Sequence, residues 1–128
     1  MSSELKKTIL DTHNELRNSI ALGQIPGYAQ ASKMAFTVGP NRPRPISVIN
    51  SPHSFQQWSD ELAFHAESHA RLCDFKHDLC RKTKEFPYSG QNLAYDAISN
   101  RYPDPPSTLK KQITRWFQEF KDADMSYI

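Results

Sequence analysis

Hydrophobic periodicity predicts an α+β fold class for this chain, with three amphipathic helices and one short strand. Three segments carry apolar residues at helical spacing, and a fourth segment alternates at strand spacing. The chain has 128 residues, a length that fits one domain with a single hydrophobic core. The sequence therefore predicts one small domain of mixed helix and strand content.

The first two predicted helices each have a clear boundary residue. The first spans about Ser3 to Leu22 and stops at Gly23, which readily takes the left-handed conformation that ends helices. The second begins after Ser59, a good N-cap, and runs to about Leu72. The stripe of the first helix holds Leu5, Ile9, Leu16 and Ile20 with His13, and that of the second holds Trp58, Leu62, Ala66 and Cys73 with His65 and His69.

The strand and the last helix come later in the chain. Residues from Gln91 to Ile98 alternate between two faces, which is typical of a strand. A proline-rich loop then leads to Ser107, which can cap the third helix. That helix has the clearest amphipathic pattern of the chain, and its apolar stripe holds Leu109, Ile113, Trp116, Phe117 and Phe120.

Between the first two helices, from about Gln24 to Ser54, the periodicity disappears. Pro26 and Gly27 indicate a turn, and the basic, proline-rich run 39–45 excludes a helix or a central strand. A structureless stretch of this length is uncommon in a compact domain and indicates insertion or disorder. A polyproline-type ligand and a solvated loop both stay open as interpretations of this run.

Charge and hydropathy argue against two classes of partner. The chain carries 16 basic and 14 acidic side chains, a net charge of +2, whereas nucleic-acid-binding proteins usually have a clustered basic face. No run approaches the roughly 20 apolar residues that span a bilayer. The start, residues 1–7, also lacks the apolar run of a secretory signal. We expect no nucleic-acid partner and no membrane span, and this start alone would not direct the chain out of the cytosol.

The two cysteines, Cys73 and Cys80, are seven residues apart. On one continuous helix this spacing is about 10.5 Å of rise, too far for a disulfide, whose Cα atoms lie within about 7 Å. The two can pair only if the helix ends near Cys73 and the chain turns back. A bridged pair and two lone thiols both stay open.

Histidines on the second helix raise the question of a zinc site. His65 and His69 share a helical face, but the zinc-protease pattern has its glutamate directly after the first histidine, and Glu67 comes two residues after it. Adding Cys73 spreads three ligands over about 12 Å of helix, too far for one tetrahedral ion. The alternatives are a two-ligand fragment completed by His77 or the second cysteine, and packed or partly exposed histidines.

Two residues are candidates for a cleft. His77 lies in the turn between the two cysteines, where a side chain can point inward. Glu119 flanks the apolar stripe of the last helix beside Trp116, rather than lying on the opposite, polar face. The alternative for both residues is ordinary surface polarity, because spacing alone does not distinguish a cleft residue from a solvated one.

Five motifs, taken in order, form a specific combination that covers most of the chain outside residues 36–56. They are His13-Asn14-Glu15-Leu16-Arg17, Trp58 with Glu61-Leu62-Ala63, Cys73 to Cys80 around His77-Asp78, Gly90-Gln91-Asn92-Leu93-Ala94, and Trp116-Phe117-Gln118-Glu119 with Tyr127. The combination resembles the CAP superfamily of cysteine-rich secretory, antigen-5 and pathogenesis-related proteins, and most closely its insect antigen-5, venom-allergen-like branch. Residues 36–56 look like an insertion relative to that branch.

The resemblance implies an α-β-α sandwich with a small antiparallel sheet, of which residues 1–128 form a single partial CAP domain without the C-terminal strands. It also implies a cleft of two histidines and two acidic residues, which binds a divalent metal in some members. By motif these positions are His77, Gln91 in place of an acidic residue, and Glu119. The second histidine belongs to a Gly-His-Tyr/Phe-Thr-Gln motif that these residues do not include.

The resemblance further implies an extracellular protein that acts by binding and not by catalysis. An amide is no general base and a poor metal ligand, so His77 and Glu119 fall short of the three or four ligands that zinc takes. We therefore expect no catalytic residue, metal or cofactor. In such relatives, cysteines like Cys73 and Cys80 tend to pair with an N-terminal cysteine segment.

Members of the superfamily bind sterols, fatty acids or other proteins, which makes a lipid or a protein receptor the expected partner. The stripe of the last helix and three tyrosines could line a groove, although core packing explains the stripe more simply. The tyrosines are Tyr88, Tyr95 and Tyr102. The alternatives are a metal-dependent hydrolase that uses His77 and Glu119, and a truncated product without function.

Overall fold

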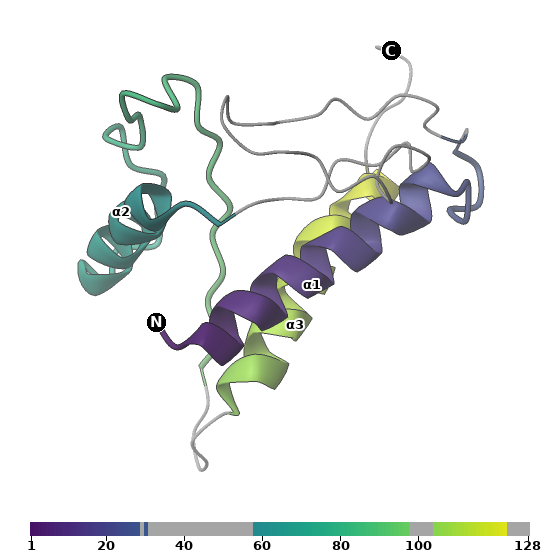
Figure 1. Cartoon of the computed structure of the whole chain (residues 1–128), viewed down its shortest axis with the longest axis horizontal. Helices are drawn as coiled ribbons and strands as arrows, with labels where there is room; N and C mark the ends of the chain where they lie inside the picture. Colours follow the sequence, from purple (N-terminus) through teal and green to yellow (C-terminus); the bar gives the residue numbers. More distant parts are fainter. Residues whose placement is uncertain (29, 31–57, 98–103, 123–128) are drawn as a thin grey trace, which may run out of the picture.

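The computed structural model describes residues 1–28, 30, 58–97 and 104–122. Its regular elements are α1 (Ser3–Ala21), α2 (Asp60–Arg71), α3 (Pro105–Gln118) and the short 3-10 helix η2 (Glu119–Asp122). Figure 1 shows α1 and α3 side by side, running in the same direction, with α2 apart from them. The insertion predicted at 36–56 lies outside the described residues, as do Tyr102 and Tyr127.

Helices α1 and α2 begin and end where the sequence predicts. The Ser2 hydroxyl accepts the N–H of Leu5 at the start of α1, and Gly23 follows its end with a φ of 68°. The Ser59 hydroxyl accepts the N–H of Leu62 at 3.3 Å, as expected of an N-cap. After α2 the backbone of Cys73 takes a φ of 51°, so the chain turns away from the helix axis at this residue.

Helix α3 begins earlier than predicted. Its N-cap is Asp104 and not Ser107, because the Asp104 carboxylate accepts both the N–H (3.0 Å) and the hydroxyl (2.5 Å) of Ser107. Pro105 and Pro106 occupy the first helical turn, where a backbone N–H has no intrahelical acceptor and proline costs nothing. The proline-rich stretch predicted to be a loop therefore includes the start of the helix.

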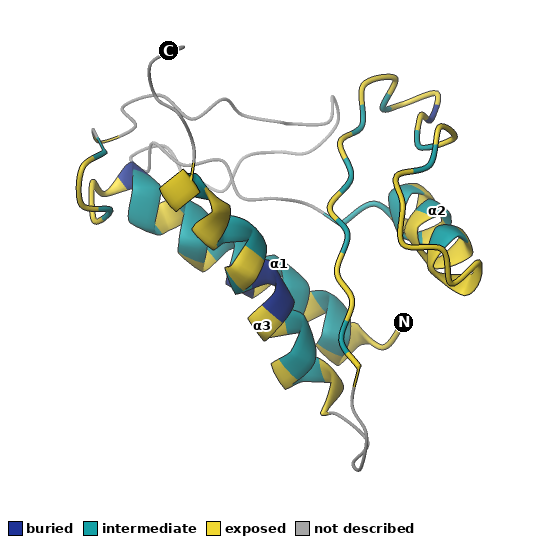
Figure 2. Ribbon diagram, turned by 180° about the vertical axis from the view of Figure 1, so that it is seen from behind, coloured by how far each residue is buried: buried dark blue, intermediate teal, exposed yellow. Residues whose placement is uncertain are grey.

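The core of the described residues lies between α1 and α3. Ala21 and Ile113 are 0% and 2% exposed, and they are the apolar residues buried in the part of the chain described. Beyond α1, the Tyr28 hydroxyl donates to the Phe120 carbonyl at 2.5 Å, and the two rings meet edge to face at 5.2 Å. Figure 2 shows this helix pair darker than α2, which has no buried residue.

The strand predicted from Gln91 to Ile98 is absent from the described residues 91–97. A strand requires a neighbouring backbone to complete its hydrogen bonds, and here the Leu93 carbonyl accepts the Trp116 indole N–H instead. The segment runs between α2 and the helix pair (Figure 1). The described residues thus contain the helices of the predicted α+β fold and not its sheet.

Contacts at the N-terminal ends join α2 to α1. The Lys6 ammonium pairs with Asp60 at 2.6 Å and lies 5.3 Å from the centre of the Trp58 ring.

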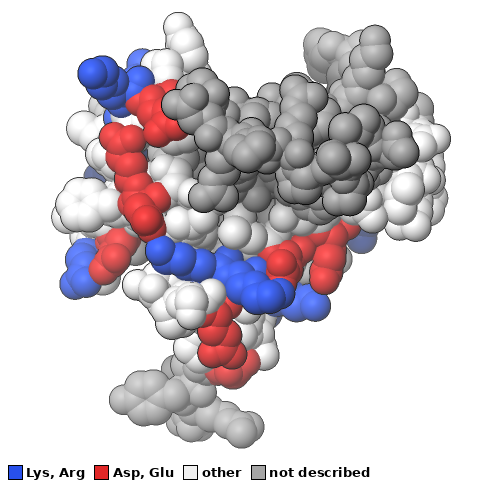
Figure 3. All heavy atoms as spheres, viewed as in Figure 1, with Lys and Arg blue, Asp and Glu red and all other residues white. Residues whose placement is uncertain are grey.

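On the face drawn in Figure 3, basic and acidic side chains of the described residues are interspersed. None of the helices described has the length and apolar character required to cross a membrane.

Candidate functional site

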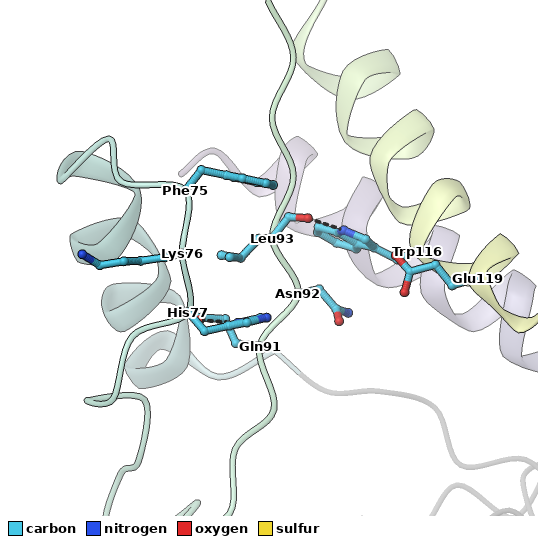
Figure 4. Close-up of a pocket in the computed structure, with 8 residues that line it drawn as sticks. All are labelled: Phe75, Lys76, His77, Gln91, Asn92, Leu93, Trp116 and Glu119. Carbon is cyan, nitrogen blue, oxygen red and sulfur yellow. Dashed lines mark hydrogen bonds between the residues drawn. The ribbon is translucent and has the colours of Figure 1, made fainter. Parts of the chain in front are cut away.

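A pocket of about 480 Å³ opens between the turn after α2, the segment around Gln91 and helix α3. Figure 4 shows its walls, which come from three separate stretches of the chain. The lining residues are Phe75, Lys76, His77, Gln91, Asn92, Leu93, Trp116 and Glu119. The three cleft positions predicted by motif, His77, Gln91 and Glu119, are therefore all present on one pocket.

The loop between His77 and Gln91 is held by its own hydrogen bonds. The Arg81 guanidinium donates to the Ser89 carbonyl at 3.1 Å and to the Asp78 carbonyl at 2.7 Å. Deeper in the loop, buried Thr83 exchanges two hydrogen bonds with Phe86: its N–H donates at 3.1 Å and its hydroxyl accepts at 2.9 Å. These bonds close the loop, so residues 14 apart in sequence meet at its base.

Gln91 is the centre of the contacts at this base. Its side-chain oxygen lies 3.0 Å from His77 Nδ1 and accepts the backbone N–H of Asp78 at 3.2 Å. Its amide nitrogen donates to the Asp78 carboxylate at 3.1 Å. Gln91 is half-buried and His77 is exposed, so the amide is fixed from behind while the imidazole lies on the pocket wall.

His69 adds a fourth side chain behind the amide. This residue of α2 has a side chain only 10% exposed, with Nδ1 3.2 Å from the Asp78 carboxylate oxygen that also accepts from Gln91. The distance suits an ion pair when the ring is protonated, although neither ring nitrogen makes a hydrogen bond within the described residues. His69 therefore faces the loop and not open solvent.

The opposite wall of the pocket belongs to α3. The Trp116 indole N–H donates to the Leu93 carbonyl at 2.8 Å, and Glu119 follows at the end of the helix. Three residues after Leu93, Asp96 accepts from three side chains of α3. These donors are Gln112 at 2.7 Å, Lys111 at 3.0 Å and Arg115 at 3.4 Å. Two kinds of contact thus fix the segment that carries Gln91 against α3.

These contacts with α3 lower the pKa of Asp96. The hydrogen bond from Lys111, followed by the charges of Lys111 and Arg115, holds the pKa of the Asp96 carboxyl below its ordinary value of 3.8. Its side chain is 21% exposed, so the pairing is partly shielded from water. Asp96 is therefore an ionised anchor for the segment at neutral pH.

The lining residues do not fit the divalent metal that the resemblance allows for. His77 and Glu119 can each supply one strong metal ligand. The side-chain oxygen of Gln91 already accepts a hydrogen bond from the N–H of Asp78 and faces His77. Across the described ranges, no three residues among His, Cys, Asp and Glu lie where they could share an ion. In α2, the His69 side chain turns toward Asp78.

The remaining candidates lie away from the pocket. Cys73 and Cys80 are both exposed and free in this structure, although α2 ends at Arg71 and the chain turns at Cys73. Tyr88 and Tyr95 are 95% and 69% exposed and do not line the pocket. The sequence patterns did not predict that His69 and Asp78 lie behind Gln91, because only the folded loop brings these residues together.

Comparisons with known proteins agree with the motifs. The family model described as "CAP: Cysteine-rich secretory protein family" matches residues 10–127. The antigen 5 like allergen Cul n 1 of Culicoides nubeculosus is 39% identical over 129 residues, covering 100% of this chain and 49% of that protein. Venom allergen-1 of Aedes aegypti is 36% identical, covering 100% and 42%. Venom allergen 3 of Solenopsis invicta is 33% identical, covering 96% and 45%.

The chain thus spans just under half the length of these relatives. No solved structure matched it. The predicted resemblance to the antigen-5, venom-allergen-like branch is confirmed by these relatives, and the family match covers nearly all of the chain. The chain belongs to the CAP, or cysteine-rich secretory protein, family.

Proposed function

We propose that this chain is the pocket-bearing part of an antigen-5-type protein that acts by binding a small amphipathic, lipid-like molecule. The observation that carries the proposal is the composition of the pocket wall. Phe75, Leu93 and Trp116 supply apolar surface, and His77 with Asn92 supplies polar groups. In the view of Figure 4, Phe75 and Leu93 lie above His77, Gln91 and Asn92. Such a wall suits a ligand with an apolar body and a polar head.

The size of the pocket supports the same proposal. A volume of about 480 Å³ falls within the range of roughly 300–1,000 Å³ that is usual for small-molecule sites. Catalysis is not part of the proposal, because the donor set at His77 and Glu119 lacks the third ligand that zinc chemistry needs. The hydrolase alternative therefore has no support from the lining residues.

The remaining parts of the proposal concern the location and the fold of the protein. We propose that the protein is extracellular, since the relatives are named as allergens and venom allergens. We also include the α-β-α sandwich of the family as the fold of the complete domain, with residues 91–97 beside its sheet. We also propose that residues 1–128 form a single partial CAP domain.

Binding can be tested with decanol as the probe and tryptophan fluorescence as the readout. The chain has two tryptophans, so a Trp58→Phe background leaves Trp116 in the pocket as the sole reporter. We expect a saturable change in emission. Phe75→Ala removes an apolar wall that is 65% exposed, and it should weaken binding by about tenfold, which corresponds to about 1.4 kcal/mol of lost contact.

Tyr88→Ala is the matched control for this experiment. It also removes an exposed aromatic ring, 95% exposed, but one that does not line the pocket. The affinity of this variant should equal that of the parent. An emission change that does not saturate, or an equal loss in both variants, would contradict the proposed pocket.

A protein receptor is the second candidate partner, favoured by apolar side chains exposed along α2 and the loop after it. Phe64, Leu72 and Leu79 are 69%, 70% and 92% exposed. Exposed apolar groups mark a protein contact when they lie together on one surface, and the receptor proposal requires that these three do. A Leu72→Ser, Leu79→Ser double variant should retain decanol binding and lose any receptor binding that uses this surface.

A further inference from the structure

We propose that Gln91 is a positioning residue that keeps the His77 ring in its Nδ1–H tautomer and presents an unprotonated Nε2 to the pocket. The inference starts from the three contacts of the Gln91 amide and from the chemistry of its neighbour Asp78. Its consequence for ligand choice rests on the proposed binding function. The tautomer itself is a property of the free protein.

Asp78 determines which way the Gln91 amide points. The backbone N–H of Asp78 can only donate, and it meets the Gln91 oxygen at 3.2 Å. A carboxylate oxygen accepts, and that of Asp78 meets the Gln91 nitrogen at 3.1 Å. Rotating the amide by half a turn would place donor against donor and acceptor against acceptor. Two independent contacts therefore select the same orientation.

The orientation of the amide then fixes the proton on His77. The Gln91 oxygen lies 3.0 Å from His77 Nδ1 and has no hydrogen to give. Nδ1 must therefore be the nitrogen that carries the proton. In a neutral imidazole the other nitrogen, Nε2, is then an acceptor. Figure 4 shows the ring extending from the Gln91 contact toward Asn92, with its outer nitrogen on the pocket side.

A half-buried histidine lies next to the carboxylate on which this order depends. The His69 side chain, 10% exposed, lies with Nδ1 3.2 Å from the same Asp78 oxygen that accepts from Gln91. On the other side, Arg81 holds the Asp78 carbonyl at 2.7 Å. Asp78 is thus restrained through both its side chain and its backbone. The contacts form one chain, from His69 through Asp78 and Gln91 to His77.

This arrangement gives the polar end of the pocket a preference among head groups. His77 Nε2 and the Glu119 carboxylate are both acceptors on the lining, and the Asn92 amide can both donate and accept. The ammonium of Lys76 pairs with Asp74 at 2.6 Å and points away from Trp116 in Figure 4. A ligand that donates a hydrogen bond, such as an alcohol, should therefore bind better than one with a carboxylate head.

The tautomer can be measured by long-range proton–nitrogen correlation NMR on the uniformly ¹⁵N-labelled chain, at a pH where the His77 ring is neutral by its own spectrum. A His77→Gln variant assigns the resonances. We expect a pyrrole-type nitrogen shift at Nδ1 and a pyridine-type shift at Nε2. The opposite assignment, with the proton on Nε2, would overturn the proposal.

Two variants distinguish positioning from a purely structural role. Gln91→Leu removes the acceptor, so Nδ1 should lose its fixed proton and the ring should become a tautomer mixture. Gln91→Glu restores an oxygen at the same place and should keep Nδ1 protonated, although its carboxylate repels Asp78. We expect both variants to lower stability, so a merely structural residue would give the same NMR result in both. Asn92→Leu, which removes a neighbouring amide from the lining, should leave the tautomer unchanged.

Head-group preference is tested by titrating decanol and decanoate, which share one tail. We expect decanol to bind at least about tenfold more tightly, a difference of about 1.4 kcal/mol, and Gln91→Leu to reduce that ratio. Equal affinities with Nδ1 protonated would overturn the head-group preference. Failure of both probes to bind, with Nδ1 protonated, would contradict the proposed binding function and still support the role of Gln91.

Discussion

The indole N–H of Trp116 donates a hydrogen bond to the backbone carbonyl of Leu93 at 2.8 Å. This bond joins α3 to the segment that begins with Gln91, two residues before Leu93. Glu119 lies three residues after Trp116, on the next turn of the helix end. One hydrogen bond thus helps to bring Glu119 to the pocket that His77 and Gln91 also line.

Replacing Trp116 by phenylalanine should destabilise the fold. The change leaves the Leu93 carbonyl without its donor in a half-buried position, a cost of about 1–3 kcal/mol. Urea denaturation measures it. Trp58→Phe is the matched control: it removes an indole N–H bonded to Asp60, whose side chain is 84% exposed and can bond to water instead. Equal losses in the two variants would contradict this account.

Acid should weaken the attachment of the segment to α3 through Asp96. Because the pKa of Asp96 is lowered in the folded chain, its contribution is fully present above 3.8 and is lost as pH falls through the lower folded value. Asp96→Asn should remove this part of the pH dependence and lower stability at neutral pH. Thermal unfolding between pH 2 and pH 5, about the range of carboxyl titration, provides the measurement.

Asp11→Asn is the control for the Asp96 variant. The Asp11 carboxylate pairs with Lys7 one turn away on the surface of α1 and is 50% exposed. Exposed pairs of this kind contribute little to stability. We expect the midpoint of unfolding to stay close to that of the parent. A loss as large as that of Asp96→Asn would show that solvent exposure does not separate the two pairs.

His13 should give a second pH dependence, nearer neutrality. Its burial in α1, and to a smaller extent the charge of Arg17, hold its pKa below the ordinary value of 6.5. As pH falls below 6.5, the unfolded chain takes up this proton before the folded chain does, so stability falls. His13→Gln should flatten the fall just below pH 6.5, as measured by urea denaturation. His65→Gln keeps His13 and should keep its slope.

Ile113 should be the most costly side chain to truncate in the core of the described residues. It is 2% exposed between α1 and α3, so Ile113→Ala leaves a cavity and should cost about 2–4 kcal/mol. Leu79→Ala, at a side chain 92% exposed, should change stability by no more than about 0.5 kcal/mol. Comparable urea midpoints for the two variants would contradict the assignment of the core.

Local sequence patterns predicted where the helices lie, but they did not predict which segments lie next to one another in space. Ser59 acts as a cap because its hydroxyl meets a backbone N–H only three residues away, so the contact is encoded nearby. The prediction that Ser107 caps α3 was wrong, because Asp104 is the N-cap and its carboxylate accepts the N–H of Ser107 itself. The two prolines between these residues suit a first helical turn. Alternation over 91–98 could not predict a strand, because a strand depends on a partner elsewhere.

The site could be predicted only as far as the motifs reached. His77, Gln91 and Glu119 were named from motifs and line one pocket. The contacts that order them could not be predicted, because Asp78 meets Gln91 across a loop closed by Arg81 and Ser89. Spacing placed His69 only on a helical face, whereas packing turned it toward Asp78.

The central claim is that the pocket binds through apolar contact and hydrogen bonds, and holds no metal ion. Calorimetric titration of the chain with Zn²⁺ tests it most directly, with His77→Ala and Glu119→Gln as the paired variants. We predict no tight, stoichiometric uptake by the parent and no difference between parent and variants. Tight binding of one Zn²⁺ per chain that disappears in both variants would contradict the claim.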